Sequence, residues 1–460
     1  MHNRNKSAFL ICFILFASFV FVAFLPVGQD EIYTKSYIVN GVLGIGSLMI
    51  YGYNFIAKGY TIFSPVSLLS AIYIMLFLVT PMYDIVLQEY TWFGVDLFDY
   101  SIKGGLIAFL GYVSFVAAYN VPVKIKAKIF FEEPRVDIVP FILFMYLMCL
   151  AANVFYIARS GGQSIIYIFS LGLLGGSSQS ETMSDIGFIA NLSFSLSSCT
   201  LLYFEYGHGK LLKVLMFLLM FVLQVVNGFR YYILQIVLMF ISYYYIRNRK
   251  KIKISQIMVL LIAVMIPIVL MTLFRNSIRS GSGMDLSILS GETILNAIDE
   301  AVWDNFRIYK TYYGVIKAVP NLTNYMFGQQ MIIYTLIMLV PRIIWPGKPL
   351  PPGGEATILG ISAYAKMAGT AYPNIGEYYY EFGIFGVVFF MGIFGRWMTT
   401  VDQRYRVNRR TNLELMVFCT LLGTILQLII RGYTPSNFWM IVFPMLPYYA
   451  VVLLNRTKID

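Results

Sequence analysis

Two glutamates lie close together in a stretch that is otherwise apolar. Glu377 and Glu381 are four residues apart in "AYPNIGEYYYEFGIFG", so both carboxylates fall near one face of a helix. An acid inside a membrane helix is energetically costly and usually functional, and either carboxylate could act as a general base toward a substrate hydroxyl. We predict that Glu377 is the base and that Glu381 is the second candidate. Two structural alternatives remain: stabilisation by the helix N-terminus, or salt bridges that orient arginines.

Arginines stand at the predicted ends of several apolar segments. Arg230 occurs in "NGFRYY", Arg275 and Arg279 in "LFRNSIRSG", and Arg431 in "LIIRGYTP". A guanidinium group binds phosphate through two parallel hydrogen bonds and stays charged at every relevant pH. Each arginine alone could simply extend to the lipid headgroups. Together, on one side of a bundle, they predict a pocket for a lipid-linked phosphate or pyrophosphate.

The segment "LVPRIIWPGKPLPP", residues 339–352, adds two further cations to this prediction. Its prolines stop helix formation and fix the backbone direction. We therefore expect Arg342 and Lys348 to be held over the bundle as part of the cationic pocket. The alternative is a structural turn whose charges are incidental.

Aromatic and amide side chains next to the glutamates could contact sugars. Tyr372, Asn374 and Tyr378 are the candidates, because tyrosine rings offer flat, hydroxyl-bearing surfaces on which a sugar ring stacks. Tyrosine is also the usual residue of the aromatic belt at a membrane interface, and with 35 tyrosines in the chain that explanation covers most of them.

The elements that must position these residues are membrane helices. The chain has 460 residues, of which 58% are hydrophobic and only 12% charged, far from the composition of a soluble domain. Apolar runs long enough to span roughly 30 Å of hydrocarbon recur throughout. They predict an all-α polytopic integral membrane protein, with 1–460 as a single membrane domain. The spans, about twelve in number, are 8–27, 37–56, 61–80, 101–120, 138–157, 185–204, 211–227, 229–246, 254–273, 377–395, 412–430 and 437–454.

Basic residues predict the orientation of these spans. Most of the 34 lysines and arginines fall in short connections on one side, including the block "RNRKKIK" at 247–253. The positive-inside rule places that side, with both termini, in the cytoplasm. The net charge of +11 is thus explained by topology, and nucleic-acid binding is not expected.

One large loop, roughly 274–376, is then extracytoplasmic and lies between the ninth and tenth spans. Apolar residues recur at intervals of four from Glu292 to Val319, which predicts an amphipathic helix that lies at the membrane surface or caps the bundle. The apolar stretch Met331 to Val340 is too short to span the membrane and should re-enter it or lie flat.

Several kinds of chemistry have no support in the sequence. The four cysteines all fall within predicted spans, and the two histidines, His2 and His208, lie on the cytoplasmic side. No nucleotide-binding fingerprint or metal-ligand spacing occurs. We therefore expect no cofactor and no metal ion.

The order and spacing of these segments resemble a known family. The segments "PRIIWPGKP" and "YPNIGEYYYEFGIFGVVFFMGIFG" resemble those of the Wzy-type oligosaccharide repeat-unit polymerases of bacterial surface polysaccharides. Also similar are "NGFRYYILQIVLMFISYYYIRNRK", "RGYTP" and the early "SPVSLLSAIYIMLFLVTPMYDIVLQEYTWFG". The resemblance covers most of the chain.

The resemblance implies a glycosyltransferase of the GT-C kind at the outer face of the bacterial cytoplasmic membrane. Arginines can stabilise the leaving pyrophosphate without a divalent ion, and no outer carboxylate pair is suited to hold one, so we expect the activity to be metal-independent. Such an enzyme transfers a growing glycan from undecaprenyl pyrophosphate to the next lipid-linked repeat unit, for O-antigen or capsule. Its implied partners are the bilayer, a chain-length regulator and a flippase. Two alternatives stay open: a flippase of lipid-linked oligosaccharides, and a polysaccharide ligase. The missing half-to-half similarity disfavours the first, and the lack of an outer histidine disfavours the second.

Overall fold

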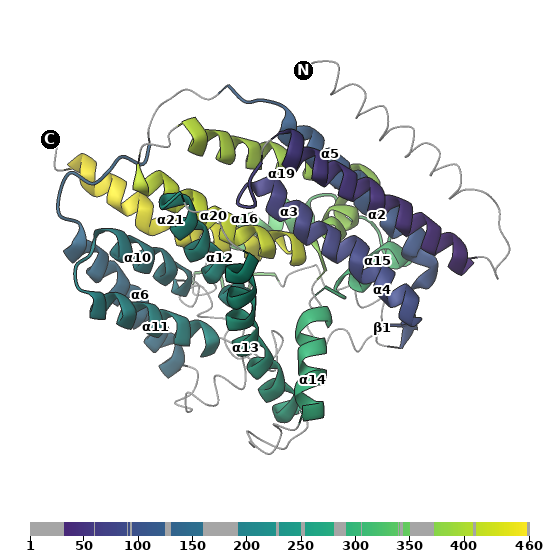
Figure 1. Cartoon of the computed structure of the whole chain (residues 1–460), viewed down its shortest axis with the longest axis horizontal. Coiled ribbons are helices and arrows are strands. Elements are labelled where there is room, and N and C mark those ends of the chain that lie inside the picture. Colours follow the sequence, from purple (N-terminus) through teal and green to yellow (C-terminus); the bar gives the residue numbers. More distant parts are fainter. Residues whose placement is uncertain are drawn as a thin grey trace.

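The computed structural model is a bundle of helices with one minimal strand pair (Figure 1). It describes residues 32–58, 60–89, 91–92, 94–124, 130–159, 192–226, 230–249, 254–279, 291–304, 306–338, 340, 344–349, 372–407 and 411–457. The α-helices are α2 (Ile32–Ala57), α3 (Pro65–Ile74), α4 (Thr80–Leu87), α5 (Ser101–Asn120), α6 (Val139–Arg159), α10 (Ser193–Tyr206), α11 (Lys210–Val226), α12 (Arg230–Arg247), α13 (Ile254–Arg279), α14 (Gly291–Asp299), α15 (Tyr309–Ala318), α16 (Thr335–Met338), α19 (Asn374–Val407), α20 (Asn412–Ile430) and α21 (Thr434–Thr457). Shorter elements are the π-helical turns η2 (Met75–Val79), η5 (Glu300–Asp304) and η6 (Gln329–Tyr334), the 3-10 turn η3 (Phe98–Tyr100), and strands β1 (Thr91–Trp92) and β2 (Val95–Asp96), which pair antiparallel.

The prediction of a helical membrane protein is confirmed, whereas the count of twelve spans is not. Within the described residues, six helical stretches are long and apolar enough to cross a membrane: Thr34–Ile56, Pro65–Leu87, Phe98–Asn120, Asn374–Arg406, Asn412–Ile430 and Thr434–Arg456. The predicted spans between 138 and 273 correspond to α6, α10, α11, α12 and α13, of which α10 has only 14 residues. The predicted span 8–27 lies outside the described residues.

Helices α5 and α19 form the closest pair in the bundle, and small residues bring their backbones together. A Cβ atom on Gly395 would lie 2.3 Å from the carbonyl oxygen of Phe115, so no larger residue fits there. The hydroxyl of Ser114 donates to the carbonyl of Val388 (2.6 Å). Residue numbers at the contacts increase in the same direction along both helices, from Ser114–Val388 to Tyr119–Thr399, so α5 and α19 run parallel. Close approach through glycine and serine is the usual way in which membrane helices associate.

Helices α12 and α20 run antiparallel. A Cβ atom on Gly423 would lie 2.7 Å from the carbonyl of Gln235, and the hydroxyl of Thr420 contacts the sulfur of Met239 (3.3 Å). This register places the beginning of α12 beside the end of α20. Figure 1 shows α19, α20 and α21 crossing the middle of the bundle, while α13 and α14 project from it.

The segment 292–319 differs from the single amphipathic helix predicted. It divides into α14, the π-helical turn η5 and α15, and α15 is almost entirely buried. Ion pairs explain the burial. Asp84 on α4, 1% exposed, accepts from Arg307 Nε (3.2 Å) and Lys310 Nζ (2.9 Å), and the hydroxyl of Tyr309 donates to it (2.7 Å). For α15 the surface alternative is therefore wrong, because Arg307, Tyr309 and Lys310 contact a buried carboxylate instead of water or lipid headgroups.

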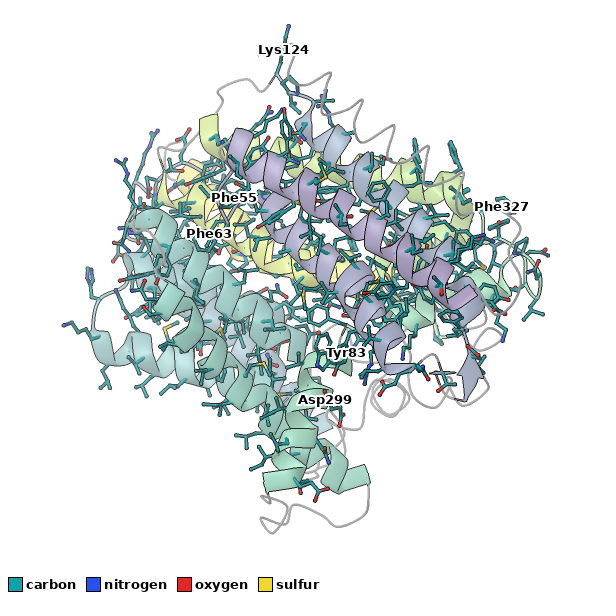
Figure 2. All side chains as sticks on the ribbon, turned by 45° about the vertical axis from the view of Figure 1, so that its right-hand side comes forward. Phe55, Phe63, Tyr83, Lys124, Asp299 and Phe327 are labelled. Atoms are coloured by element: carbon teal, nitrogen blue, oxygen red, sulfur yellow. The ribbon has the colours of Figure 1, made fainter. Side chains whose placement is uncertain are left out.

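The predicted inner and outer connections lie at opposite ends of the helices. Figure 2 shows Phe55 and Phe63, near the α2–α3 connection, on one side of the molecule and Phe327, before η6, on the other. The apolar segment 331–340 forms η6 and α16, which together are too short to span a membrane, as predicted. In the same view the label Asp299 marks the last residue of α14, the helix that projects from the bundle.

Candidate active site

Helix α19 begins directly after a proline, Pro373. Pro373 precedes the first helical residue, and its carbonyl accepts from the backbone N–H of Gly376 (2.8 Å). A Cβ atom on Gly376 would lie 3.2 Å from the side chain of Tyr372, so the first turn closes tightly over that ring. This turn directs Glu377 toward the neighbouring helix ends rather than toward lipid.

Glu377 is 1% exposed and is held by two partners from distant parts of the chain. Its Oε1 accepts from the backbone N–H of Thr434 (2.9 Å) and from Gln330 Nε2 (2.9 Å). Its Oε2 accepts from the hydroxyl of Thr434 (2.5 Å). Hydrogen bonds to a buried carboxylate are short and strong, so this carboxylate fixes η6 and the beginning of α21 to the beginning of α19.

Gln330 connects Glu377 to Tyr372. The Nε2 group of Gln330 donates to the phenolic oxygen of Tyr372 (2.7 Å) as well as to Glu377, while its Oε1 is buried without a hydrogen-bond partner. Burial, and then the charge of Glu377, raise the pKa of Tyr372 well above its ordinary value. The phenol is therefore neutral and keeps its proton for a further hydrogen bond.

Glu381 has a different environment, although it lies on the same helix. It is fully buried, and its carboxylate accepts from the backbone N–H groups of Gly328, Gln330 (3.1 Å) and Met331 (2.7 Å). These are the free N–H groups at the start of η6, so Glu381 caps that turn. Immediately afterwards α19 kinks, at Phe382 and at Gly383 with a φ of 63°, a conformation that favours glycine.

The motif "RGYTP" forms the turn that places Thr434 in contact with Glu377. Arg431 ends α20, and the N–H of Gly432 donates to the carbonyl of Tyr372 (2.6 Å). A Cβ atom on Gly432 would lie 2.4 Å from the carbonyl oxygen of Pro373, so only glycine allows this approach. Helix α21 then starts at Thr434, with Pro435 in its first turn, where proline is tolerated.

The predicted cations are only partly described. Arg431 is half-buried, and its carbonyl accepts from Asn437 Nδ2 (2.6 Å). Lys348 donates from Nζ to the carbonyl of Val340 (3.1 Å), and its N–H donates to Trp345, which closes a turn within the proline-rich segment. Arg230 begins α12, beside the end of α20. The side chains of Arg230, Arg275 and Arg279, and the whole of Arg342, lie outside the described residues.

Two observations bear on whether the arginines converge. Arg230 and Arg431 stand at adjacent helix ends, because α12 and α20 are antiparallel. Arg275 and Arg279 belong to the last turns of α13, the helix that packs against the projecting α14 (Figure 1). Arg431 is three residues before Thr434, which binds Glu377, and the convergence of the arginines on one pocket stays a prediction.

The predicted sugar contacts are mostly buried in this structure. Tyr372 is 5% exposed and Asn374 2% exposed, whereas Tyr378 is half-buried with its ring against Phe390 (5.4 Å between centroids). Asn374 keeps one oxygen, Oδ1, without a hydrogen-bond partner. A role of these residues in holding sugar stays a prediction.

Nearly the whole chain matches one protein family. The family model described as O-antigen polysaccharide polymerase Wzy covers residues 7–458. The chain belongs to the Wzy family. No curated protein and no solved structure matches it. As a Wzy family member with helices that can span a membrane, it is an integral membrane protein of polysaccharide biosynthesis, with a polymerase role on lipid-linked oligosaccharide repeat units.

Gln330 and Thr434 are two residues of this candidate site that the sequence did not predict. Thr434 lies within "RGYTP", but nothing in the sequence links it to a glutamate more than fifty residues earlier. Gln330 precedes the apolar run 331–340 and carries no charge that would draw attention. Among the described residues, neither Glu377 nor Glu381 forms an ion pair, and no group of three or more His, Cys, Asp or Glu could hold a metal ion.

Proposed function

We propose that this protein lengthens a bacterial surface polysaccharide by transferring the growing glycan from undecaprenyl pyrophosphate to the next lipid-linked repeat unit. The observation that carries the proposal is the buried Glu377–Thr434 pair at the end of a Wzy family helix bundle. This end is opposite the one that carries most basic residues, so the positive-inside rule places the reaction on the outer face of the cytoplasmic membrane.

In the proposed reaction, the acceptor hydroxyl donates its hydrogen bond to Thr434 Oγ1. Thr434 is half-buried and Glu377 is fully enclosed, so the threonine hydroxyl is the more accessible of the two. As the acceptor oxygen attacks the anomeric carbon, its proton passes to Thr434, and the proton of Thr434 passes to Glu377. The bond between the anomeric carbon and the phosphate oxygen breaks, and the pyrophosphate leaves with the electron pair.

The leaving pyrophosphate needs cations and no nucleotide. Arg431 follows directly from α20 and is joined to Thr434 by the turn that contacts Tyr372. We assign Arg431 and Arg230 to the pyrophosphate, together with the predicted Arg275, Arg279, Arg342 and Lys348. Arginine can stabilise the departing charge without a divalent ion, so we propose metal-independent transfer.

Glu381 receives a positioning role in this proposal. Three backbone N–H groups occupy its carboxylate, which leaves it poorly placed to accept a substrate proton. It holds the beginning of η6 against α19, and thereby holds Gln330 within reach of Glu377. Tyr372, Asn374 and Tyr378 are assigned to the sugar, with Tyr378 the most accessible of the three.

The test is a reconstitution in liposomes. Purified protein receives undecaprenyl-pyrophosphate-linked repeat units and EDTA, and the products are separated by size. A ladder of lengthening glycans is the expected result, and Glu377→Gln should abolish it while the variant still folds. Movement of the lipid-linked sugar across the bilayer without a ladder would overturn the proposal in favour of a flippase. A ladder that requires added divalent ions would overturn its metal-independent part.

A further inference from the structure

A cavity of about 700 Å³ lies between α10, α12 and α13, away from the candidate active site. Its walls are mostly apolar and aromatic, formed by Leu201 and Phe204 on α10, Phe240 and Ile241 on α12, and Val259 on α13. A volume of this size is within the range of small-molecule sites. Val259 is 66% exposed, so the cavity opens to the outside of the bundle rather than into its core.

Polar groups line one end of this cavity. Arg247, the last residue of α12, donates from NH2 to Glu205 (2.6 Å), and its guanidinium lies over the ring of Tyr243. Tyr245 donates its hydroxyl to Gln256 (3.0 Å), which joins α12 to α13. Aromatic residues with polar tips at this level are typical of a membrane interface.

The guanidinium of Arg247 retains the capacity to bind an anion. An arginine has five N–H donors in a planar fork, and one of its nitrogens contacts Glu205. The side chain is 38% exposed, so the remaining donors can reach a ligand at the cavity mouth. Glu205 also accepts from Asn412 (2.9 Å) and from Tyr243 (2.5 Å), so the carboxylate holds the arginine in a fixed place.

A strongly basic segment follows α12 in the sequence. The sequence "RNRKKIK" begins at Arg247 and connects α12 to α13, and it contains five basic and no acidic residues. Two of the three helices that line the cavity, α12 and α13, are therefore joined by the most basic segment of the chain. Basic residues near a membrane surface attract anionic lipids.

From this juxtaposition, we infer that the cavity is a binding site for an anionic phospholipid of the bilayer. One acyl chain fills the apolar part along Phe240 and Val259, and the phosphate contacts Arg247 beside Asn248. The apolar walls account for the chain, and the guanidinium of Arg247 accounts for the preference for negative charge. A soluble phosphate would leave the apolar walls empty, so it explains only half of the site. The inference does not rest on the proposed function.

The test uses the full chain in detergent and native mass spectrometry, with phosphatidylglycerol and phosphatidylcholine of identical acyl chains. Wild-type protein should bind phosphatidylglycerol about tenfold more tightly than phosphatidylcholine. Arg247→Gln should remove that preference, whereas Arg249→Gln, two residues further along the same basic segment, should retain it. Val259→Trp should weaken both lipids because it closes the acyl slot, whereas Val222→Trp, exposed on α11, should not.

Four outcomes would overturn the inference. One is equal binding of the two lipids by wild-type protein, and another is unchanged binding of phosphatidylglycerol by Val259→Trp. A third is an equal loss from Arg247→Gln and Arg249→Gln, which would mean unspecific attraction to the basic segment. Displacement of the lipid by glycerol phosphate would show a site for soluble phosphate instead. If Arg247→Gln fails to fold once Glu205 is unpaired, the two tryptophan variants decide, because neither changes a charge.

Discussion

The hydroxyl of Thr434 donates a 2.5 Å hydrogen bond to the buried carboxylate of Glu377, and this contact joins the start of α21 to the start of α19. The backbone N–H of the same threonine also donates to Glu377, at 2.9 Å to Oε1. One residue thus supplies two of the donors that fix the carboxylate. In the proposed reaction it is also the group through which the acceptor proton reaches Glu377.

Substitutions of Thr434 can separate its structural role, as a hydrogen-bond donor that fixes Glu377, from its proposed role in proton transfer. Thr434→Ser keeps the hydroxyl and should retain polymerisation within about tenfold, whereas Thr434→Val removes it and should lower the rate by about 100-fold or more. Both variants keep the backbone hydrogen bond, so thermal unfolding in detergent should show both folded. The readout is the initial rate of ladder formation. Equal rates for the serine and valine variants would exclude a proton relay through this residue.

Glu381→Gln should affect stability more than chemistry. The amide would present an N–H group to backbone N–H donors and lose hydrogen bonds to a charged acceptor, worth roughly 1.5–3 kcal/mol each. We expect a lower melting temperature in detergent and a polymerisation rate that falls less than the rate of Glu377→Gln. If Glu381→Gln were fully stable and inactive, a catalytic role for Glu381 would have to replace the positioning role.

Gly432→Ala should disrupt the site through the backbone. The added Cβ would lie 2.4 Å from the carbonyl oxygen of Pro373, so the turn or the start of α19 must shift. Even a shift of about 1 Å can cost 100-fold in rate when it moves reacting groups. The matched control is Gly41→Ala on α2, where no atom lies within 4 Å of the new Cβ. The control should keep wild-type polymerisation, and comparable losses in both variants would contradict the argument from close packing.

Asp84→Asn should destabilise the protein, because the buried Lys310 then faces a neutral amide in place of a carboxylate, whereas Arg307 keeps its ion pair with Glu89 (2.5 Å). Breaking a buried ion pair in this way costs about 3–5 kcal/mol. Adding Lys310→Met should restore part of the stability by removing one of the two charges. Glu132→Gln is the control, since its pair with Arg135 is more than half exposed and should contribute less than about 1 kcal/mol. Denaturant or thermal unfolding in detergent measures all four proteins.

Arg431→Lys should be a poor substitute if the guanidinium fork holds pyrophosphate. The ammonium group keeps the charge but loses the bidentate geometry, so the polymerisation rate should fall by about tenfold or more. Arg249→Lys at the other end of the bundle should leave the rate unchanged. A wild-type rate for both Arg431→Lys and Arg431→Ala would remove Arg431 from the pyrophosphate site.

Composition and the spacing of apolar runs were sufficient to predict the helical membrane class, and most segment positions. Helices α5, α20 and α21 lie where the apolar runs predict them, because a backbone inside hydrocarbon must satisfy its own hydrogen bonds and so becomes helical wherever the run is long enough. The number of spans could not be predicted from the apolar runs in the same way. A short helix such as α10 is apolar and buried within the bundle, which hydropathy does not distinguish from a span.

The sequence by itself also pointed to Glu377 as a candidate, since an acid in an apolar helix is costly wherever it is placed. Its partners were decided only by the tertiary structure. Gln330 and Thr434 belong to segments that are 47 and 57 residues away from it, and neutral hydrogen-bonding residues leave no periodic pattern. For the same reason, the sequence could not distinguish the environment of Glu381 from that of Glu377. Four residues apart in one helix, they look equivalent, but one faces the free N–H groups of η6 and the other a threonine hydroxyl, because the kink at Gly383 and the turn at Gly432 set what each carboxylate meets.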